Sequence, residues 1–347
     1  MTFSTFMFKA MAFILSIFVT GIPYVKTAPS VLQTKEENCL LNVEMISDIH
    51  VEQMFKIKGE ILKQGLIKMG ESESEIDAVV VAGDLTNYAD EESLADFYDV
   101  VKQYSPAQAI IAAGNHDIGH VGDKGVTNIS REEAKQNVIK YYNEYSNQNL
   151  TTNYYSLYVN GYKFIVLGDD VLYGGSWDDI RFSQEQLDFL DRELAEGTKD
   201  GLPTFVLCHW GMSGINGENT VYEDTGIDPA EFDVKGIMEK YKNVYYISGH
   251  MHSGFKSKFI EKTFGLSNAE QVNGVTYLNL PSFGFLNMYG YPWPGTGAQL
   301  EVYEDKVVFR PRNYLTEKWF ENCEYTFKLV KNKKLPELND ISGSFCC

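Results

Sequence analysis

Gly114-Asn115-His116-Asp117 follows directly after Ala109-Ile110-Ile111-Ala112-Ala113, and this junction is the starting point for predicting the fold. The apolar run predicts a buried strand, and the glycine and three polar residues mark its carboxyl end. In open α/β sheets, ligands bind at that end of the strands. Asparagine offers an oxygen ligand, histidine a proton donor or metal ligand, and aspartate a partner that orients the histidine. Because turns also use Gly, Asn and Asp for backbone reasons, the tetrapeptide alone leaves a purely structural role open.

Four further junctions share this design, an apolar strand followed at once by polar, ligand-type residues. They are residues 43–47 before Asp48-Ile49-His50, residues 78–82 before Gly83-Asp84, residues 204–208 before His209, and residues 244–248 before Gly249-His250-Met251-His252. The junctions hold all but one of the 6 histidines, and the remaining one, His120, lies in the polar segment after Asp117. A purely structural explanation would need independent coincidences at five strand ends, so the pattern favours one shared site.

Helical spacing of apolar residues appears between these strands. It predicts helices near residues 52–69, 90–103, 131–145, 183–194 and 229–241. Ser183 and Gln186 have the spacing of a capping box. Repeated strand-helix-strand units imply a parallel sheet.

Two turn signals predict antiparallel hairpins. Asn160-Gly161 separates residues 154–159 from 162–167, and Glu304-Asp305 separates residues 300–303 from 307–310. The chain after Phe255 is predicted to form short strands of a second sheet. We therefore expect residues 43–347 to form a single domain that includes a C-terminal β extension.

Residues 1–28 have the features of a secretion signal. Lys9 supplies the positive charge, residues 11–19 are apolar, and Lys26-Thr27-Ala28 offers a cleavage point. The apolar run is short for a transmembrane span, although an uncleaved N-terminal anchor is an alternative. We expect a secreted or extracytoplasmic protein with no stable membrane insertion after signal removal, and we interpret residues 29–42 as a linker or tail.

The formal net charge of -18 disfavours nucleic-acid duplexes and anionic membranes as partners. It is compatible with a small anionic substrate, because bound divalent cations would dominate the local field. In an oxidising compartment Cys323 could pair with Cys346 or Cys347. Asn128 and Asn149 begin glycosylation sequons.

The strand-end residues that can bind metal carry carboxylate oxygens, an amide oxygen and imidazole nitrogens. They are Asp48, His50, Asp84, Asn115, His209, His250 and His252. This donor set suits Mn, Fe or Zn and argues against Ca. It is too large for one ion and suits two, which can hold a bridging hydroxide and clamp a phosphoryl group. Asp84 stands alone after its strand and is the natural carboxylate to bridge the pair.

The order Asp-x-His, Gly-Asp, Gly-Asn-His-Asp, a lone His after a strand, and Gly-His-x-His resembles the calcineurin-like metallophosphoesterases. The resemblance covers roughly residues 43–310. It implies the metallophosphoesterase fold, an α/β/β/α sandwich of two mixed sheets with the dimetal site at the carboxyl ends of the strands. Any single motif is common, but the combination is specific.

Carried over residue by residue, the resemblance implies two overlapping ligand sets. One divalent or trivalent transition-metal ion takes Asp48, His50, Asp84 and His252, and the other takes Asp84, Asn115, His209 and His250. His116 matches the position that donates a proton to the leaving oxygen, and Asp117 is expected to hold its ring. The chemistry agrees, because His116 adjoins a ligand without being needed as one.

Two details bear on the branch of the family. Purple acid phosphatases have Asp-x-Gly in the first motif and Tyr at the position of Asn87, which disfavours that branch. Gly83-Asp84-Leu85-Thr86-Asn87 is closer to the class III cyclic-nucleotide phosphodiesterases. We therefore expect a hydrolase of phosphate esters, preferably diesters, with a metal-bridging hydroxide as nucleophile. The alternatives are a phosphomonoesterase of nucleotides or sugar phosphates, and a non-catalytic metal- or partner-binding protein on the same fold.

Overall fold

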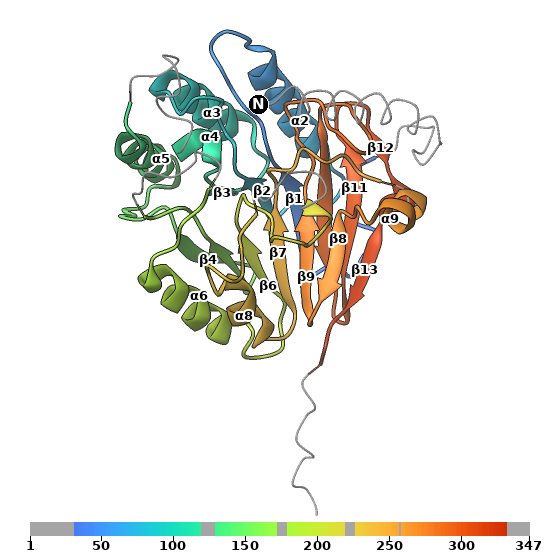
Figure 1. The fold of residues 1–347 in the computed structure, drawn as a ribbon. Helices are drawn as coiled ribbons and strands as arrows, with labels where there is room; N and C mark the ends of the chain where they lie inside the picture. The colour runs from blue at the N-terminus through green and yellow to red at the C-terminus, as the bar shows by residue number, and fades with distance from the viewer. Residues whose placement is uncertain (1–30, 119–128, 172–178, 219–225, 257, 332–347) are drawn as a thin grey trace, which may run out of the picture.

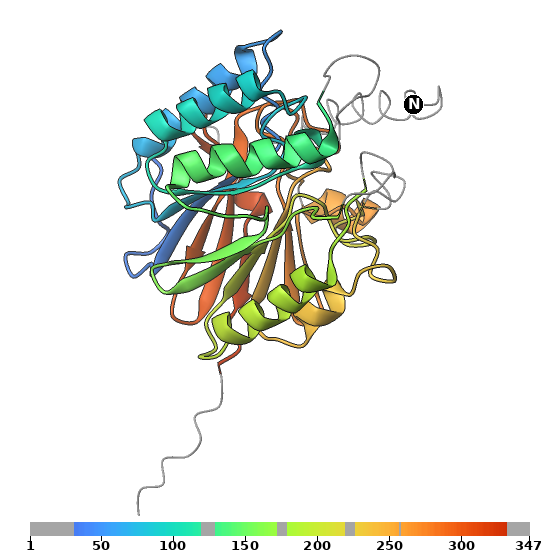
Figure 2. The same ribbon diagram turned by 90° about the vertical axis from the view of Figure 1, so that its left-hand side faces the viewer.

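The computed structural model describes residues 31–118, 129–171, 179–218, 226–256 and 258–331. Within these ranges, two mixed β-sheets pack face to face between two layers of helices (Figure 1). Figure 2 shows the four layers edge-on, with helices outside each sheet. The predicted α/β/β/α sandwich is confirmed.

The first sheet contains 7 of the described strands, in the order β12-β11-β10-β1-β2-β3, with β13 paired to β11. They are β1 (Leu41–Ile46), β2 (Ala78–Ala82), β3 (Ala109–Ala112), β10 (Thr296–Val302), β11 (Lys306–Asn313), β12 (Lys318–Trp319) and β13 (Tyr325–Lys328). β1, β2 and β3 run parallel, and β10 joins β1 antiparallel. Every residue of β1, β2 and β3 is buried, as expected for parallel strands covered on both faces.

The second sheet contains 6 of the described strands, in the order β4-β5-β6-β7-β9-β8. They are β4 (Tyr155–Val159), β5 (Tyr162–Val166), β6 (Thr204–Leu207), β7 (Val244–Ser248), β8 (Ala269–Val272) and β9 (Val275–Asn279). Asn160 and Gly161 both have positive φ, 48° and 81°, as a tight two-residue hairpin turn requires. The two predicted hairpins, β4–β5 and β10–β11, are therefore confirmed.

The described helices are α2 (Ile57–Gly70), α3 (Glu91–Tyr104), α4 (Asn115–Ile118), α5 (Arg131–Ser146), α6 (Gln184–Gly197), α8 (Val234–Glu239) and α9 (Lys258–Phe264). α2, α3 and α5 cover the first sheet, and α6 and α8 cover the second (Figure 2). The Asp90 side chain accepts from Ser93 N at the start of α3, and Ser130 accepts from Glu133 N at the start of α5. These caps explain why the predicted helices at 90–103 and 131–145 begin where they do.

Two predicted helices are shorter than their apolar patterns indicate. The helix expected from residue 52 begins at Ile57, because Val51 still pairs with Thr86 across the sheet edge. Met54 and Phe55, which the pattern assigned to a buried helix face, are instead exposed. The helix expected at 229–241 is reduced to α8, because residues 228–232 form a turn closed on the Asp228 carbonyl.

The predicted capping box at α6 is half correct. The Ser183 hydroxyl accepts from Gln186 N, as a helix N-cap does. The Gln186 side chain does not return the bond, because it is buried and holds both the N–H and the carbonyl of Gly168. Ser183 N donates to Asp170 instead. Gln186 therefore ties α6 to the end of β5.

The described part of the predicted linker contacts the domain. Leu32 is buried, and its carbonyl accepts from Glu73 N beyond the end of α2. The secretion signal, His120, the Asn128 sequon, Cys346 and Cys347 lie outside the described residues. Among the described helices, none combines the length and apolarity needed to cross a membrane.

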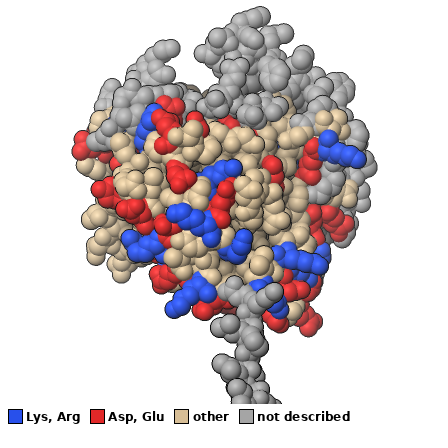
Figure 3. Space-filling model, turned by 60° about the horizontal axis from the view of Figure 1, so that its bottom comes forward, with Lys and Arg blue, Asp and Glu red and all other residues tan. Residues whose placement is uncertain are grey.

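Acidic and basic side chains are intermingled on the face seen in Figure 3. That face is the end of the molecule away from α4. A duplex-binding surface would present basic side chains without interspersed acids. The described side chains on this face therefore do not form such a surface.

A buried carboxyl group in β1 should make stability depend on pH. Burial raises the pKa of Glu44 from 4.5 to about 8, although Tyr314, which donates to it, acts in the opposite direction. Between those values the unfolded chain releases a proton that the folded chain keeps, so stability falls as pH rises from 4.5 to about 8. We expect Glu44→Gln to remove this pH-dependent change in the free energy of unfolding, which is on the order of several kcal/mol.

Thermal unfolding at pH 5 and pH 8 measures this effect. The fall in Tm between the two pH values should be smaller in Glu44→Gln than in the wild type. Glu185→Gln, an exposed change on α6, is the matched control and should behave as wild type. An equal fall in all three proteins would contradict the assignment.

Candidate metal centre

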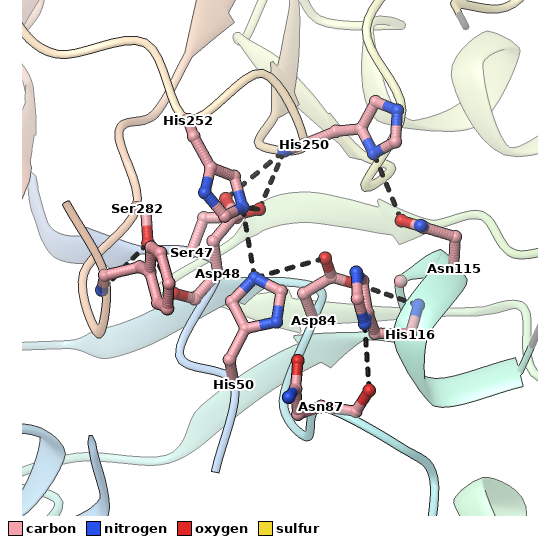
Figure 4. A network of polar contacts seen from close by, with 12 residues as sticks. Ser47, Asp48, His50, Asp84, Asn87, Asn115, His116, His250, His252 and Ser282 are labelled. Atoms are coloured by element: carbon pink, nitrogen blue, oxygen red, sulfur yellow. Dashed lines mark hydrogen bonds and ion pairs between the residues drawn. The ribbon is translucent and has the colours of Figure 1, made fainter. Parts of the chain in front are cut away.

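The carboxyl ends of β1, β2, β3, β6 and β7 meet at one edge of the sandwich. Backbone hydrogen bonds continue beyond the strands, from His50 N to Asp84 O at 2.9 Å and from Gly249 N to His209 O at 2.9 Å. Figure 4 shows side chains from the segments after β1, β2, β3 and β7 directed into a common space. The structure thus brings together all seven predicted metal ligands, from segments up to about two hundred residues apart in the chain.

The backbone is strained at these positions. The angle φ is 53° at Asp48, 57° at His50, 51° at Asp84, 69° at His250 and 44° at His252. Left-handed backbone in residues other than glycine costs on the order of 1–3 kcal/mol each and clusters at functional sites. Its concentration at five predicted ligands indicates that the fold maintains this arrangement for the chemistry of the side chains.

One group of donors consists of Asp48, His50, Asp84 and His252, whose ligand atoms all lie within 4.8 Å of one another. His252 Nε2 lies 3.1 Å from Asp48 Oδ1, and His50 Nε2 lies 3.5 Å from Asp84 Oδ2. The two Nε2 atoms of His50 and His252 are 3.0 Å apart. Three of the four residues are buried, and His252 is partly exposed, so the group opens to solvent on one side.

A second group shares Asp84. His209 Nε2 lies 3.2 Å from Asp84 Oδ2 and 3.1 Å from Asn115 Oδ1. His250 Nδ1 lies 3.1 Å from the same Asn115 oxygen. His209 Nδ1 faces the Ala82 carbonyl at 2.7 Å, and donation to it fixes the tautomer that leaves Nε2 for the site. Asp84 is therefore the carboxylate placed between the two groups.

The protonation of these groups matches what a cation needs. Burial would raise the pKa of both Asp48 and Asp84, but His252 beside Asp48 and His209 beside Asp84 hold both values below the ordinary range. Burial lowers the pKa of His50, and lowers that of His250 to about 3. Two carboxylates and two imidazoles are therefore in their ligand forms at neutral pH.

His209 supplies a second indication that a cation fits. Burial alone would lower its pKa, but Asp84 beside it raises the pKa to about 9. A proton on His209 thus balances the buried carboxylate at neutral pH, and a metal ion would take the place of that proton. With the oxygen and imidazole donors around it, the site fits transition-metal ions.

His116 lies beside these groups on α4. Its Nδ1 is 2.9 Å from the Asn87 carbonyl oxygen, and its backbone N donates to Asp84 Oδ1 at 3.0 Å. Its ring meets the His50 ring edge-on, with centroids 4.7 Å apart. Donation of Nδ1–H to the carbonyl leaves Nε2 as the nitrogen for proton exchange.

Asp117 does not hold the His116 ring, and that prediction is wrong. Its buried carboxylate instead accepts from the backbone N–H groups of Gly114, Leu85 and Thr86, and from the Thr86 hydroxyl. Burial, followed by the nearby charge of Asp84, raises the pKa of Asp117 to about 6. Asp117 therefore joins the segments after β2 and β3, and the Asn87 carbonyl takes the role predicted for it.

Two motif glycines are required by close approach. A Cβ on Gly114 would lie 2.1 Å from Asp84 Oδ1, and a Cβ on Gly249 would lie 1.9 Å from Ser47 Oγ. Any side chain there would displace a proposed ligand or its support. The glycines in the Gly-Asn-His-Asp and Gly-His-x-His motifs thus let the strand ends pack together.

The sequence did not reveal one supporting segment, residues 281–285 after β9. Ser282 Oγ donates to the Asp48 carbonyl at 2.8 Å, and Ser47 pairs with Ser282 as an isolated bridge. Ser282 Oγ also accepts from Phe285 N at 3.1 Å. Residues 280–285 are mostly apolar and include no metal-binding side chain, so nothing in the sequence pointed to this supporting role.

The sequence model of the calcineurin-like phosphoesterase family matches residues 42–254. Among solved structures, the chain is similar to a purple acid phosphatase from yellow lupin, Lupinus luteus. That match has a TM-score of 0.55 and 14% identity, and covers 83% of this chain and 53% of the lupin chain. The chain therefore spans about half the length of that relative, and the likeness shows the fold alone.

Two other structures are more distant. Vacuolar protein sorting 29 from Cryptosporidium parvum has a TM-score of 0.37 and 12% identity, with 84% of this chain and 98% of that chain covered. An archaeal phosphodiesterase has a TM-score of 0.33 and 12% identity, with 83% and 100% covered. No curated protein sequence matches the chain.

The family match covers more than half of the 347 residues. It contains every predicted ligand from Asp48 to His252, together with His116. The fold agrees with that of the lupin enzyme. The chain belongs to the calcineurin-like phosphoesterase family.

Proposed function

We propose that this protein is a dimetal hydrolase of phosphate esters that prefers diesters. Membership of the family and the buried Asp/His cluster support metal-dependent phosphoric ester hydrolysis. The observation that carries the proposal is the division of the donors into two groups that share Asp84. A single-ion site would not need the second group.

The proposed first ion is held by Asp48, His50, Asp84 and His252, and the second by Asp84, Asn115, His209 and His250. Ions of the Mn, Fe or Zn type would supply Lewis acidity and make water nucleophilic at neutral pH. Protein hydrogen bonds orient two of the donors, from His209 Nδ1 to the Ala82 carbonyl and from His250 N to Asp48. The chain thus fixes the donor atoms in advance.

His116 is the proposed general acid. The Asn87 carbonyl holds Nδ1 at 2.9 Å, so the ring has one orientation and presents Nε2. The backbone N of His116 is tied to Asp84, which couples the ring's position to the proposed bridging carboxylate. A proton delivered from Nε2 to the departing oxygen would assist cleavage of the ester bond.

The diester preference is supported by motif. Asp48-x-His50 and Gly83-Asp84-Leu85-Thr86-Asn87 resemble the class III cyclic-nucleotide phosphodiesterases, not the purple acid phosphatases. The similarity to the lupin purple acid phosphatase is a similarity of fold and does not bear on the difference between the motifs of the two branches. A phosphomonoesterase and a non-catalytic binding protein are the alternatives to be separated.

One experiment separates the three functions. The purified protein is analysed for Mn, Fe and Zn, and assayed with p-nitrophenyl phosphate and bis(p-nitrophenyl) phosphate. We expect about two ions per chain and a higher kcat/KM for the diester. A preference for the monoester would favour the phosphomonoesterase, and two ions without turnover of either ester would favour the binding protein. None or one ion after reconstitution with Mn would contradict the dimetal site.

We also propose that the protein is exported. Support comes from Lys9, the apolar residues 11–19 and the small residues up to Ala28. The N-terminus of the exported protein, read by mass spectrometry, should begin between about Gly21 and Val31. An intact Met1 on protein confined to the cytosol would reject export, and an intact Met1 on membrane-bound protein would support the uncleaved anchor.

A further inference from the structure

An aromatic side chain lies at the open side of the metal centre. The Phe285 ring centroid is 6.2 Å from that of His50 and 6.1 Å from that of His252. Phe285 is 47% exposed, although most phenylalanines in this core are buried. Because both histidines are proposed ligands of one ion, a phosphate ester bound there would place its organic part next to this ring.

The Phe285 ring packs against a buried lysine. Lys58 Nζ lies 4.7 Å from the centroid of the Phe285 ring, within the range of a cation–π contact. Lys58 is buried, and its Nζ pairs with Glu52 Oε1 at 2.6 Å. The other Glu52 oxygen accepts from Asn87 Nδ2 at 3.1 Å. The exposed Phe285 ring therefore contacts the buried ion pair between Lys58 and Glu52.

Exposed apolar side chains also occur on both chain segments that meet at this contact. Leu286, the next residue after Phe285, is 40% exposed. On the segment that leads to Lys58, Met54, Phe55 and Ile57 are 80%, 59% and 62% exposed. Exposed apolar side chains on two segments joined by the Lys58–Phe285 contact support a binding role at this place.

The chemistry of the side chains at this contact favours an apolar group of the substrate over a polar one. A sugar or a second charged group would need hydrogen-bond partners beside it. The surface at this contact offers the Phe285 ring and aliphatic side chains, and the cation that touches the ring, Lys58, is buried and paired with Glu52. An aryl or alkyl group would instead remove from water both its own apolar surface and that of the protein.

We propose that Phe285, with Leu286 beside it, forms a substrate wall that binds an apolar aryl or alkyl group of the phosphate ester. The inference rests on the proposed hydrolase function and adds the class of substrate. Phe285 acts here as a specificity-determining residue. It takes no part in proton transfer or in metal binding.

The test compares two diesters with the same leaving group, phenyl p-nitrophenyl phosphate and methyl p-nitrophenyl phosphate. Phe285→Ala should lower the ratio of their kcat/KM values about tenfold, the size of one aromatic contact together with the area it buries. Phe285→Tyr keeps the ring and should keep most of the ratio. Leu202→Ala is the matched control, because Leu202 is 39% exposed just before β6, at the opposite end of that strand from His209.

A binding measurement accompanies the assays. Calorimetry with phenylphosphonate and methylphosphonate on the metal-loaded protein should show tighter binding of the phenyl compound, and Phe285→Ala should remove the difference. If the wild type hydrolyses both diesters and the ratio is unchanged in Phe285→Ala, the wall is overturned while the hydrolase stands. If neither ester is hydrolysed, the calorimetry with the two phosphonates still tests the substrate wall. Equal affinity of the wild type for the two compounds would overturn it.

Discussion

Replacement of Asp84 by alanine is expected to abolish hydrolysis of phosphate esters and to lower the content of both metal ions. Asp84 Oδ2 lies 3.5 Å from His50 Nε2 and 3.2 Å from His209 Nε2, one nitrogen in each donor group. Loss of this carboxylate removes a negatively charged donor from both groups at once. The fall in kcat/KM should exceed ~10⁴-fold, beyond the effect of a single general acid.

Metal analysis and activity assays on the same preparations measure this effect. Asp84→Asn keeps an oxygen that accepts from His116 N but removes the charge, so it should also lose metal. Asp188→Ala, an exposed change on α6, is the control and should retain both ions and full activity. Two ions per chain in Asp84→Ala would show that Asp84 does not bridge.

Replacement of His116 by alanine is expected to lower kcat by ~10²–10⁴-fold, the usual contribution of a positioned general acid. Metal content should stay near that of the wild type, because His116 lies outside both donor groups and faces the Asn87 carbonyl. The loss should be larger for an alkyl ester than for a p-nitrophenyl ester. A poor leaving group needs the proton, whereas p-nitrophenolate departs without it.

His50→Ala provides the contrast to His116→Ala. The two rings touch edge-on, with centroids 4.7 Å apart, yet only His50 belongs to the donor cluster. His50→Ala should therefore lose metal together with activity, and His116→Ala should lose activity alone. If His116→Ala loses its metals, His116 is a ligand. If it keeps both metals and full activity on an alkyl ester, the general-acid role is wrong.

Local sequence patterns predicted much of the sandwich. Mostly apolar runs before Asp48, Asp84 and His209 identified buried parallel strands, because strands covered on both faces are mainly apolar. Asn160-Gly161 identified a hairpin, because both of its residues tolerate positive φ. Ser183 identified the start of α6 for a similarly local reason, because its hydroxyl accepts from Gln186 N.

Predictions failed where tertiary contacts outweighed local preference. Apolar spacing extended the first helix back to Glu52, but the chain up to Val51 stays in the sheet and α2 begins at Ile57. The Ser183–Gln186 spacing indicated a reciprocal cap, but the strand end at Gly168 holds the Gln186 amide. The partner of a buried polar group such as the Gln186 amide is therefore set by the whole fold and not by local spacing.

The sequence by itself determined the family, the fold class and the metal-ligand residue types, because these depend on which residue follows which strand. Only the tertiary structure decided which groups meet across the site. It showed that Asp117 joins two loops and the Asn87 carbonyl orients His116, and it placed Phe285 against His50. The physical reason is that a side chain's role depends on distance and burial, and packing sets both for residues that lie far apart in the chain.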